Sequence, residues 1–543
     1  MHAVLRLSAV AVAIVTMLAP VQAVEPQAPG RLITAEEAVL IAIRSRLTNV
    51  KVSRKPTQTE KGAANDRAGL AKFYATLGEQ GNADGATGRP LWVARTGLTD
   101  QARAALREIN NSAEWGFSPD HFDMPEHAFA GSAPLSAREL VDLEMRTSLA
   151  ILKYARFARG GRMDPTDLSL DIDRKPPLLP ASDVLRGAHE AADVAAFLQG
   201  LHPKHDQFVK LRAAYLKALE DEADGIEPVV EEETRRGKKR RKRNRNRTPL
   251  SKRLLYNMEM WRWMPEDLGD VYVMPNIPEF RIRVIKKNRI IHSERIVAGK
   301  VANKTPVFSD ELETVVFRPN WGIPNSIKVK EILPKILSGK GIERQGFRVQ
   351  AAGRDIDPRT INWSTVDIRN YHIYQPPGRR NALGLVKFLF PNKHAVYFHD
   401  TPSKYLFKKK NRAYSHGCMR VRDPMKMAAV IFGEDRGWTK AKIDELAASR
   451  VDNRQIRLNK KIPVHVTYFT ARANQDGEIE LVKDVYGHEK LIQKGFDGLA
   501  HTIVKPNRSL DKYLRDRIGR SEIADNPVRR RRSRDWMRNI WGN

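Results

Sequence analysis

The 543-residue chain contains a single cysteine, Cys418. One cysteine excludes an intramolecular disulfide, so the fold is not a disulfide-stapled scaffold and the thiol stays free for chemistry. The sequence also lacks paired CxxC motifs, a P-loop and a GxGxxG fingerprint. Their absence leaves no motif evidence for a zinc ribbon, a nucleoside triphosphatase or a dinucleotide-binding enzyme.

Long apolar runs are missing too, apart from residues 7–18 near the N-terminus. This run follows a short basic start and precedes small residues at Val21 and Ala23. That order is typical of a cleavable signal peptide, here over residues 1–23. A spanning helix needs about 20 apolar residues, so a retained membrane anchor is the less favoured alternative. We therefore expect an exported protein.

Acidic residues are too few to balance the basic ones, because 94 Lys and Arg face 64 Asp and Glu, a formal net charge of +30. This excess favours an acidic polymer as partner. Two basic runs stand out, residues 235–247 and residues 529–534, the second beside Trp536 and Trp541. The first predicts an extended linker over residues 226–250, either plainly solvated or attached to an anionic surface. The second resembles an interfacial anchor.

No nucleic-acid-binding motif accompanies the charge, and an export signal argues against nuclear import. Nucleic acid is therefore not expected as a partner. Residues 32–225 carry helical signals, with a capping-box pattern at residues 34–37 and apolar spacing of three and four over residues 98–109 and 136–159. We expect a mostly helical domain there, with a positioning role.

Polar and basic residues surround Cys418, unlike the apolar neighbours of a packing cysteine. His399, His416 and the arginines Arg412, Arg420 and Arg422 are expected to favour the reactive thiolate. Cys418 is therefore the candidate nucleophile. A buried structural cysteine after a glycine turn remains the alternative, because reactivity depends on geometry.

The apolar alternation of residues 394–399 predicts a strand that delivers His399 at its end. A basic loop with Lys408, Lys409 and Lys410 follows, and then a short strand over residues 413–418. A hairpin-like return would bring the imidazole and the thiol within hydrogen-bond reach. Asp423 and Pro424 predict a helix start just after the thiol.

Residues 415–421, Ser-His-Gly-Cys-Met-Arg-Val, preceded by His399, resemble the active-site signature of the L,D-transpeptidases, the YkuD domain. Further segments resemble strands of the same catalytic domain, namely residues 273–280, 281–285, 297–300, 305–309 and 320–324. Residues 375–378, 381–384 and 390–392 resemble the large periplasmic YcbB-like branch, and residues 90–93 and 161–165 resemble its scaffold domain.

The resemblance implies a multidomain α+β protein, with a mostly helical scaffold domain before a mainly β catalytic domain that carries a helix and loop lid. The expected boundaries are a signal peptide at 1–23, the scaffold domain at 32–225, the linker at 226–250, the catalytic domain at 251–490 with its lid at about 327–371, and a basic extension at 491–543.

By the same resemblance, Cys418 forms an acyl-enzyme with the diaminopimelate of a tetrapeptide stem, releases D-alanine and makes a 3→3 peptidoglycan cross-link. The alternatives are an L,D-carboxypeptidase, attachment of a protein to peptidoglycan by the same thiol, or an inactive wall-binding scaffold. The expected partners are donor and acceptor stem peptides, with anionic wall polymers or the membrane surface for the basic runs. The expected location is the periplasm.

The family pattern assigns His399 as the general base and the carbonyl of Asp400 as the group that orients its imidazole. Ser415, His416 and Gly417 are expected to shape the oxyanion site. Arg420, Tyr397 and Trp321 are expected to contact substrate. No cofactor or metal is expected, although His399, His416 and Cys418 are zinc-compatible ligand types.

Overall fold

The computed structural model describes residues 35–48, 58–80, 89–125, 135–225, 248–474 and 476–505. The expected signal peptide, the basic run at 235–247 and the C-terminal run with its two tryptophans lie outside the described residues, as does Thr34 of the capping-box pattern. In these described ranges, no helix has the length and apolar character needed to cross a membrane.

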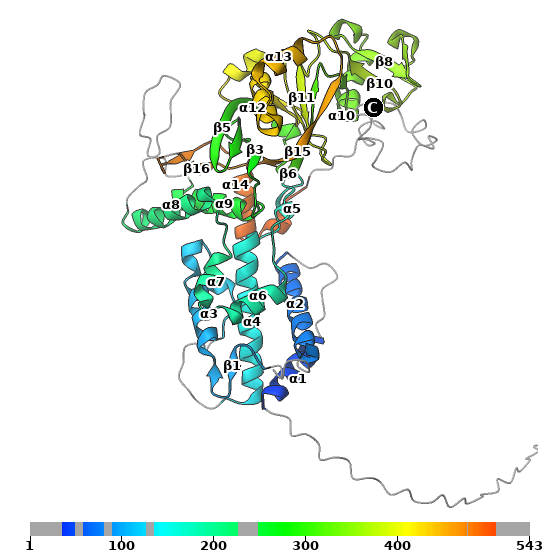
Figure 1. The fold of residues 1–543 in the computed structure, drawn as a ribbon. Helices are drawn as coiled ribbons and strands as arrows, with labels where there is room; N and C mark the ends of the chain where they lie inside the picture. The colour runs from blue at the N-terminus through cyan, green and yellow to red at the C-terminus, as the bar shows by residue number, and fades with distance from the viewer. Residues whose placement is uncertain are drawn as a thin grey trace, which may run out of the picture.

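The N-terminal half is helical, as predicted, and most of it forms the column in the lower part of Figure 1, whereas α8 and α9 lie above that column. α4 shows why: Ser136 and Glu139 form a capping box at its start, and Gly161, with φ of 82°, ends it. A two-stranded ribbon and nine helices make up this half of the described chain: β1 (Val93–Ala94), β2 (Gly97–Leu98), α1 (Ala35–Thr48), α2 (Gln58–Gln80), α3 (Asp100–Asn110), α4 (Ala137–Gly160), α5 (Pro165–Leu168), α6 (Ala181–Glu190), α7 (Val194–Gly200), α8 (Asp206–Ala223) and α9 (Leu250–Arg262).

A buried carboxylate organises the helical core. Glu144 of α4 accepts hydrogen bonds from the Tyr74 hydroxyl, from Leu91 N at 2.6 Å and from Trp92 N at 2.8 Å. Burial raises the pKa of Glu144 to about 7, although these hydrogen bonds lower it. One side chain thus ties α2 and the segment before β1 to the longest helix of the column.

The C-terminal half is mainly β, again as predicted, and its nine-stranded sheet closes on itself because β4 also pairs with β5. The order is β13-β5-β14-β12-β11-β6-β15-β3-β4. The strands are β3 (Val271–Asn276), β4 (Arg281–Lys286), β5 (Arg289–Gly299), β6 (Phe308–Phe317), β11 (Val386–Leu389), β12 (Phe398–His399), β13 (Ala413–Ser415), β14 (Met419–Val421) and β15 (Arg454–Val466). α12 (Pro424–Arg436), α13 (Lys440–Ala448), α14 (His488–Phe496), β16 (Ala471–Ala473) and β17 (Ile479–Leu481) complete this half.

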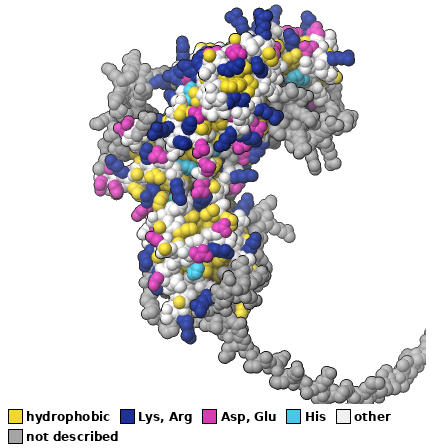
Figure 2. Space-filling view, in the orientation of Figure 1, with side chains coloured by type: hydrophobic (Ala, Val, Ile, Leu, Met, Phe, Trp, Pro, Cys, Tyr) yellow, Lys and Arg dark blue, Asp and Glu magenta, His cyan; other side chains and the backbone are white. Residues whose placement is uncertain are grey.

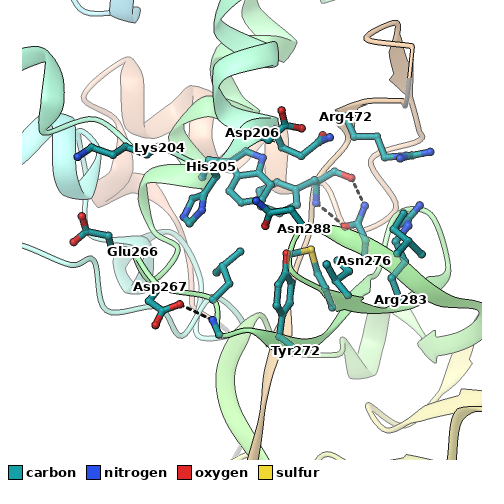
Figure 3. Close-up of a pocket in the computed structure, with 18 of the residues that line it drawn as sticks. Lys204, His205, Asp206, Glu266, Asp267, Tyr272, Asn276, Arg283, Asn288 and Arg472 are labelled. Atoms are coloured by element: carbon teal, nitrogen blue, oxygen red, sulfur yellow. Dashed lines mark hydrogen bonds between the residues drawn. The ribbon is translucent and has the colours of Figure 1, made fainter. Parts of the chain in front are cut away.

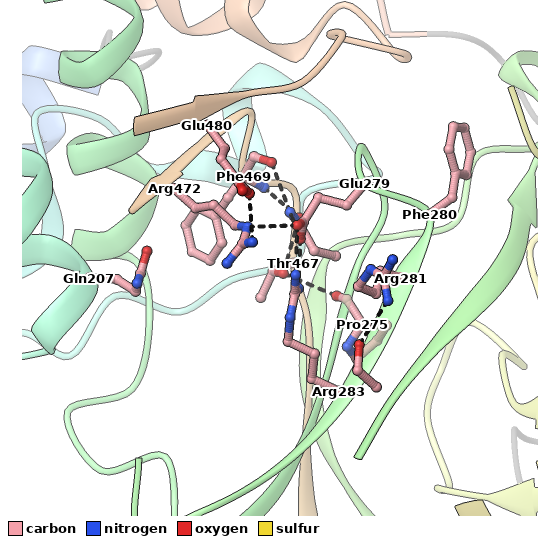
Figure 4. Close-up of polar contacts among 12 residues, drawn as sticks. Gln207, Pro275, Glu279, Phe280, Arg281, Arg283, Thr467, Phe469, Arg472 and Glu480 are labelled. Carbon is pink, nitrogen blue, oxygen red and sulfur yellow. Dashed lines mark hydrogen bonds and ion pairs between the residues drawn. The ribbon is translucent and has the colours of Figure 1, made fainter. Parts of the chain in front are cut away.

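The helices α8 and α9 share their apolar core with this barrel, whereas α1 to α4, α6 and α7 share a separate core. A charge network joins β16 to the barrel. Arg283 donates to both carboxylate oxygens of Glu279 at 2.7 Å, and Arg472 of β16 pairs with the same carboxylate (Figure 4). Burial alone would raise the pKa of Glu279, but the two guanidinium groups bring it below its ordinary value.

The lid has a core and a sheet of its own. Its four strands, in the order β7-β10-β8-β9, are β7 (Trp321–Gly322), β8 (Arg348–Ala351), β9 (Arg354–Ile356) and β10 (His372–Gln375). The helix expected in the lid is observed as α10 (Asn325–Ile327), a π-helical turn η4 (Lys328–Ile332) and α11 (Leu333–Leu337). Val329, Leu333 and Trp363 are among the residues that form its buried cluster.

The raised pKa of Glu144 predicts a pH effect on stability. The folded chain binds this proton at a pKa of about 7 against an ordinary 4.5, so its stability should fall as pH rises from about 4.5 to 7. Urea unfolding across that window should show this slope for the wild type and a weaker one for Glu144→Gln. Parallel curves would contradict the assignment, because all other titrating groups are common to both proteins.

Candidate active site

Two short parallel strands bring the candidate base and nucleophile together. β12 pairs with β14 in parallel register, with Phe398 opposite Met419 and His399 opposite Arg420. The expected hairpin-like return is therefore wrong, because a hairpin would give an antiparallel pair. The chain instead runs from β12 through the 3-10 helix η8 (Lys404–Lys408) and β13 before β14. Cys418 ends up at the start of β14, one residue before its pairing begins.

The strand expected over residues 394–399 is also shorter than predicted, since only Phe398 and His399 are extended and paired. Ala395 has φ of 55°, which breaks the strand. The side chain of Asn392 replaces the ladder, because its Oδ1 accepts from His394 N and Val396 N at 3.1 Å each. Residues 392–396 thus form a turn that the Asn392 side chain holds. Asparagine favours turns, but the apolar alternation of this segment indicated a strand instead.

His399 is 5% exposed and its Nδ1–H donates to the carbonyl oxygen of Asp400 at 2.5 Å. A carbonyl can only accept, so this bond leaves the lone pair on Nε2 for the cavity that His399 lines. Burial, with help from the Arg420 charge, lowers the pKa of His399 to about 3. The imidazole is therefore neutral at physiological pH and able to accept a proton.

Asp400 supports this geometry with its side chain as well. One carboxylate oxygen accepts from Leu385 N at 2.9 Å, and the other pairs with Lys404 Nζ at 2.5 Å. A Cβ built on Gly384, whose φ is 59°, would meet Asp400 Oδ2 at 2.2 Å. A glycine is therefore required where β11 approaches this carboxylate.

Cys418 lies half-buried in the cavity that His399 also lines, and its thiol donates to the carbonyl oxygen of Ala395 at 3.6 Å. Burial raises the pKa of the thiol to about 11, while hydrogen bonds from the backbone and side chain of Tyr397 and the Arg420 charge lower it. Arg420 thus favours the thiolate as expected, but burial outweighs its charge, and in the free protein a neutral thiol and a neutral imidazole line the same cavity.

Two of the three expected arginines are occupied elsewhere. Arg412 donates to backbone carbonyls, including those of Ile296 and Phe280, and Arg422 pairs with Glu294 at 2.7 Å. Of these three arginines, only Arg420 has a charge that lowers the pKa of the thiol. Its Nε is buried without a hydrogen-bond partner among the described residues, so this guanidinium has capacity left for an anion.

Ser415 and Gly417 shape the loop rather than bind in the cavity themselves. The Ser415 hydroxyl donates to Cys418 O at 2.5 Å and accepts from Gly417 N at 3.2 Å. Gly417 has φ of 120°, and its carbonyl accepts from the Thr305 hydroxyl at 2.7 Å. Because Gly417 N is occupied by Ser415, it is not free for an oxyanion, in contrast to the expectation.

His416 is exposed and turns toward the lid. Its Nε2 contacts the carboxylate of Glu331 on η4, and Lys300 Nζ lies 3.8 Å from the same carboxylate. Within the described residues, His399, His416 and Cys418 belong to no group suited to holding a metal ion. The observed role of the His416 side chain is therefore a contact between catalytic loop and lid.

Tyr397 and Trp321, expected as substrate contacts, are placed against the nucleophile. The Tyr397 hydroxyl hydrogen-bonds both the Trp321 side chain and the Cys418 thiol, and burial raises the pKa of Tyr397 well above its ordinary value. Trp321 is the first residue of β7, which is the first strand of the lid. The lid is therefore joined to the thiol through one tyrosine.

These residues line a cavity of about 960 Å³, at the upper end of the range for small-molecule sites. Four parts of the chain contribute to it: the barrel, the lid through Trp321 to Glu331, the helical half through Leu168 to Asp171, and the C-terminal segment through Leu491 and Ile503 to Lys505. All nine sequence-predicted site residues except Asp400 line it directly.

A second cavity, of about 350 Å³, lies between α8 and strands β3 and β4 (Figure 3). Its lining includes Asp206, Tyr272 and Arg472, and none of the sequence-predicted site residues. The chemistry expected of this chain is therefore concentrated in the larger cavity.

Sequence reasoning missed several groups that complete the site. The carbonyl oxygen of Ala395 accepts from the thiol, and the Thr305 hydroxyl holds the Gly417 carbonyl. Glu331 of the lid contacts His416, and Lys300, directly after β5, lies near the same carboxylate. For Thr305 and Pro306 the sequence indicates only a strand. None of these contacts has a sequence signal, because each joins residues distant along the chain.

Comparison with known proteins agrees with this architecture. A family model described as the scaffold domain matches residues 69–214, and the model of the YkuD L,D-transpeptidase catalytic domain matches residues 270–433. The chain thus carries a YkuD L,D-transpeptidase catalytic domain, with a scaffold domain ahead of it.

A curated relative from Haemophilus influenzae, named "Putative L,D-transpeptidase", is 31% identical over 247 residues, which are 45% of this chain. The match spans about half of that relative, 49% of its length. A solved L,D-transpeptidase from Mycobacterium smegmatis is 10% identical, covers 36% of this chain and 58% of its own, and has a TM-score of 0.18, too low to support an argument about fold.

The neutral resting pair predicts the pH profile of the thiol. Alkylation of Cys418 by iodoacetamide should rise with pH through the neutral range and level off only near 11. Arg420→Gln should move the midpoint upward, because the guanidinium lowers the thiol pKa. A plateau below pH 7 would contradict the neutral pair and indicate a preformed thiolate.

Proposed function

We propose that the protein forms 3→3 cross-links between peptidoglycan stem peptides through a Cys418 acyl-enzyme. The observation that supports this most directly is the placement of the thiol and of the only free imidazole nitrogen of His399 in one cavity. The catalytic-domain match supports the family, and the reaction is inferred from the site.

The first half-reaction begins as Cys418 Sγ attacks the carbonyl of diaminopimelate at position 3 of a tetrapeptide stem. The thiol proton passes to His399 Nε2 as the carbon–sulfur bond forms. His399 then returns this proton to the nitrogen of the departing D-alanine, and a thioester remains. Because the pKa values of about 11 and about 3 keep the proton on sulfur beforehand, transfer accompanies attack.

The second half-reaction uses the side-chain amine of another stem. The amine attacks the thioester, its proton moves to His399 Nε2, and the thiol is restored with that proton. The amide of Cys418 has no acceptor among the described residues, so it is the candidate donor to the oxyanion in both steps.

The charge of the cavity suits peptide stems, which carry free carboxylates. Lys304, Lys330, Lys393, Arg420 and Lys505 line it, against Asp171 and Glu331. Arg420 lies opposite His399 in the sheet and has an unpaired Nε, so it is placed to bind a stem carboxylate. Together with the expected export signal, these features support a periplasmic enzyme.

The loop between β12 and β13 presents a cationic surface. Lys408 to Lys410 are exposed, and none forms an ion pair among the described residues. Arg281 and Arg295 lie near enough to Arg412 to lower its pKa, after burial as the larger cause. Figure 2 shows Lys and Arg side chains crowding the β-rich half. This surface can attract anionic stems toward the loop that leads to Cys418.

The reaction is tested by incubating residues 24–543 with purified tetrapeptide monomers, beside Cys418→Ala, and analysing the muropeptides by mass spectrometry. We expect a thiol-dependent dimer that lacks one D-alanine and is joined through two diaminopimelates. A tripeptide without dimer would replace the proposal with a carboxypeptidase. No change with folded protein would favour a wall-binding scaffold.

The cationic surface predicts a salt-dependent affinity. Substituting Lys408, Lys409 and Lys410 by Gln should raise the apparent KM at low salt and lose this effect as screening grows, with kcat and thiol alkylation unchanged. The matched control replaces Lys426, Lys440 and Lys442 of α12 and α13, which contribute nothing to the cavity. An equal KM change in both variants would point to net charge alone.

A further inference from the structure

A short segment of the helical half is built into the barrel beside the catalytic cavity. Ile172 forms a parallel bridge with Val307, Asp173 N donates to Val307 O at 2.8 Å, and Val307 N donates to Asp171 O at 2.7 Å. Ile172 is 2% exposed and belongs to the barrel core. The segment follows α5, which lies at the foot of the barrel (Figure 1). It therefore acts as an added strand at the start of β6.

The next residues lock this segment in place. Arg174 is 4% exposed and donates to Val466 O at 2.6 Å and to the Ser309 hydroxyl. Ser309 in turn bonds His465 Nδ1 at 2.7 Å. His465 is thus part of the anchor of this segment.

Asp173 uses both carboxylate oxygens on the catalytic half. Oδ1 pairs with Lys393 Nζ at 2.8 Å, and Oδ2 pairs with His394 Nε2 at 2.8 Å. Burial would raise the pKa of Asp173, but the hydrogen bonds and charges of these two partners bring it below its ordinary value. The carboxylate is therefore ionised and fully engaged at neutral pH.

Lys393 and His394 belong to the turn that surrounds the thiol. Asn392 holds this turn from within, since its Nδ2 also donates to Val396 O at 2.8 Å. The left-handed backbone of Ala395 requires such support, because a residue with a Cβ rarely adopts it unaided. Asp173 supplies the external support, from a segment more than 200 residues away.

The far end of the turn contacts Cys418 and its neighbour Met419. The thiol donates to Ala395 O at 3.6 Å, it is bonded by the backbone and hydroxyl of Tyr397, and Met419 N donates to Tyr397 O at 3.1 Å. A shift of the turn would therefore move the groups that cover the thiol and set its direction.

We propose that Asp173 is a positioning residue, through which the helical half fixes the turn of residues 392–397 and thereby the orientation and shielding of the Cys418 thiol. This rests on the proposed function in taking Cys418 as the nucleophile. It assigns the scaffold domain a part in the chemistry of the catalytic domain.

The competing role is simple adhesion between the two halves. Glu266 offers a matched control, since its carboxylate pairs with Arg159 of α4 at 2.7 Å and contacts no residue of the turn. Glu266→Gln removes the single ion pair with Arg159, and Asp173→Ala removes the two contacts with Lys393 and His394. Only the second is expected to reach the thiol.

The experiment uses the full mature chain and measures Cys418 alkylation by iodoacetamide against pH, together with kcat and KM for cross-linking. In Asp173→Ala, loosening of the turn should expose the thiol, because burial is the main cause of its raised pKa. We expect alkylation at pH 8 to become faster while kcat falls roughly tenfold and KM stays the same. Asp173→Asn should recover part of the wild-type behaviour, and Glu266→Gln should match the wild type.

Unchanged alkylation and kcat in folded Asp173→Ala would overturn the proposal and leave adhesion alone. If that variant does not fold, His394→Gln carries the same test, because it removes the ring contact and leaves the Lys393 pair in place. The alkylation profile needs no substrate. A wild type that makes no dimer would therefore refute the proposed reaction without deciding the role of Asp173.

Discussion

The parallel pairing of β12 with β14 is the constraint on which the site depends. It brings together residues nineteen positions apart, with His399 opposite Arg420 and Cys418 just ahead of the pair. The residues between them must leave the sheet, pass through η8 and return in the same direction. This detour places the basic loop on the outside of the barrel and the thiol inside the cavity. A hairpin of the same length would have reversed β14 and changed which side chains face the imidazole.

The same pairing buries the reactive groups, and burial sets their resting charge. The thiol keeps its proton because its pKa is raised to about 11, and the imidazole stays neutral because its pKa is lowered to about 3. Neither group is activated in isolation. In the proposed reaction the proton moves only when a substrate carbonyl accepts the sulfur, which limits side reactions of the free thiol.

The cavity is an assembly of the whole chain rather than of the catalytic domain alone. Trp321 of the lid bonds Tyr397, which bonds the thiol. Glu331 of the lid contacts His416. The helical half contributes Leu168 to Asp171 to the wall, and Asp173 to the turn behind it. The family match treats the scaffold and catalytic domains as separate models. Their packing shows that the site spans both.

The sequence by itself determined the class of fold and the two domain types, and it indicated Cys418 and His399 as the candidate nucleophile and base, because apolar spacing, caps and the Ser415–Val421 motif are local signals. It also located the helix after Asp423, whose side chain caps α12. Only the tertiary structure decided the parallel strand order, the turn at Ala395, the engagement of Arg412 and Arg422 with other partners, and the raised thiol pKa. These depend on burial and on contacts between distant residues, such as Asp173 with His394, and no local pattern encodes either quantity.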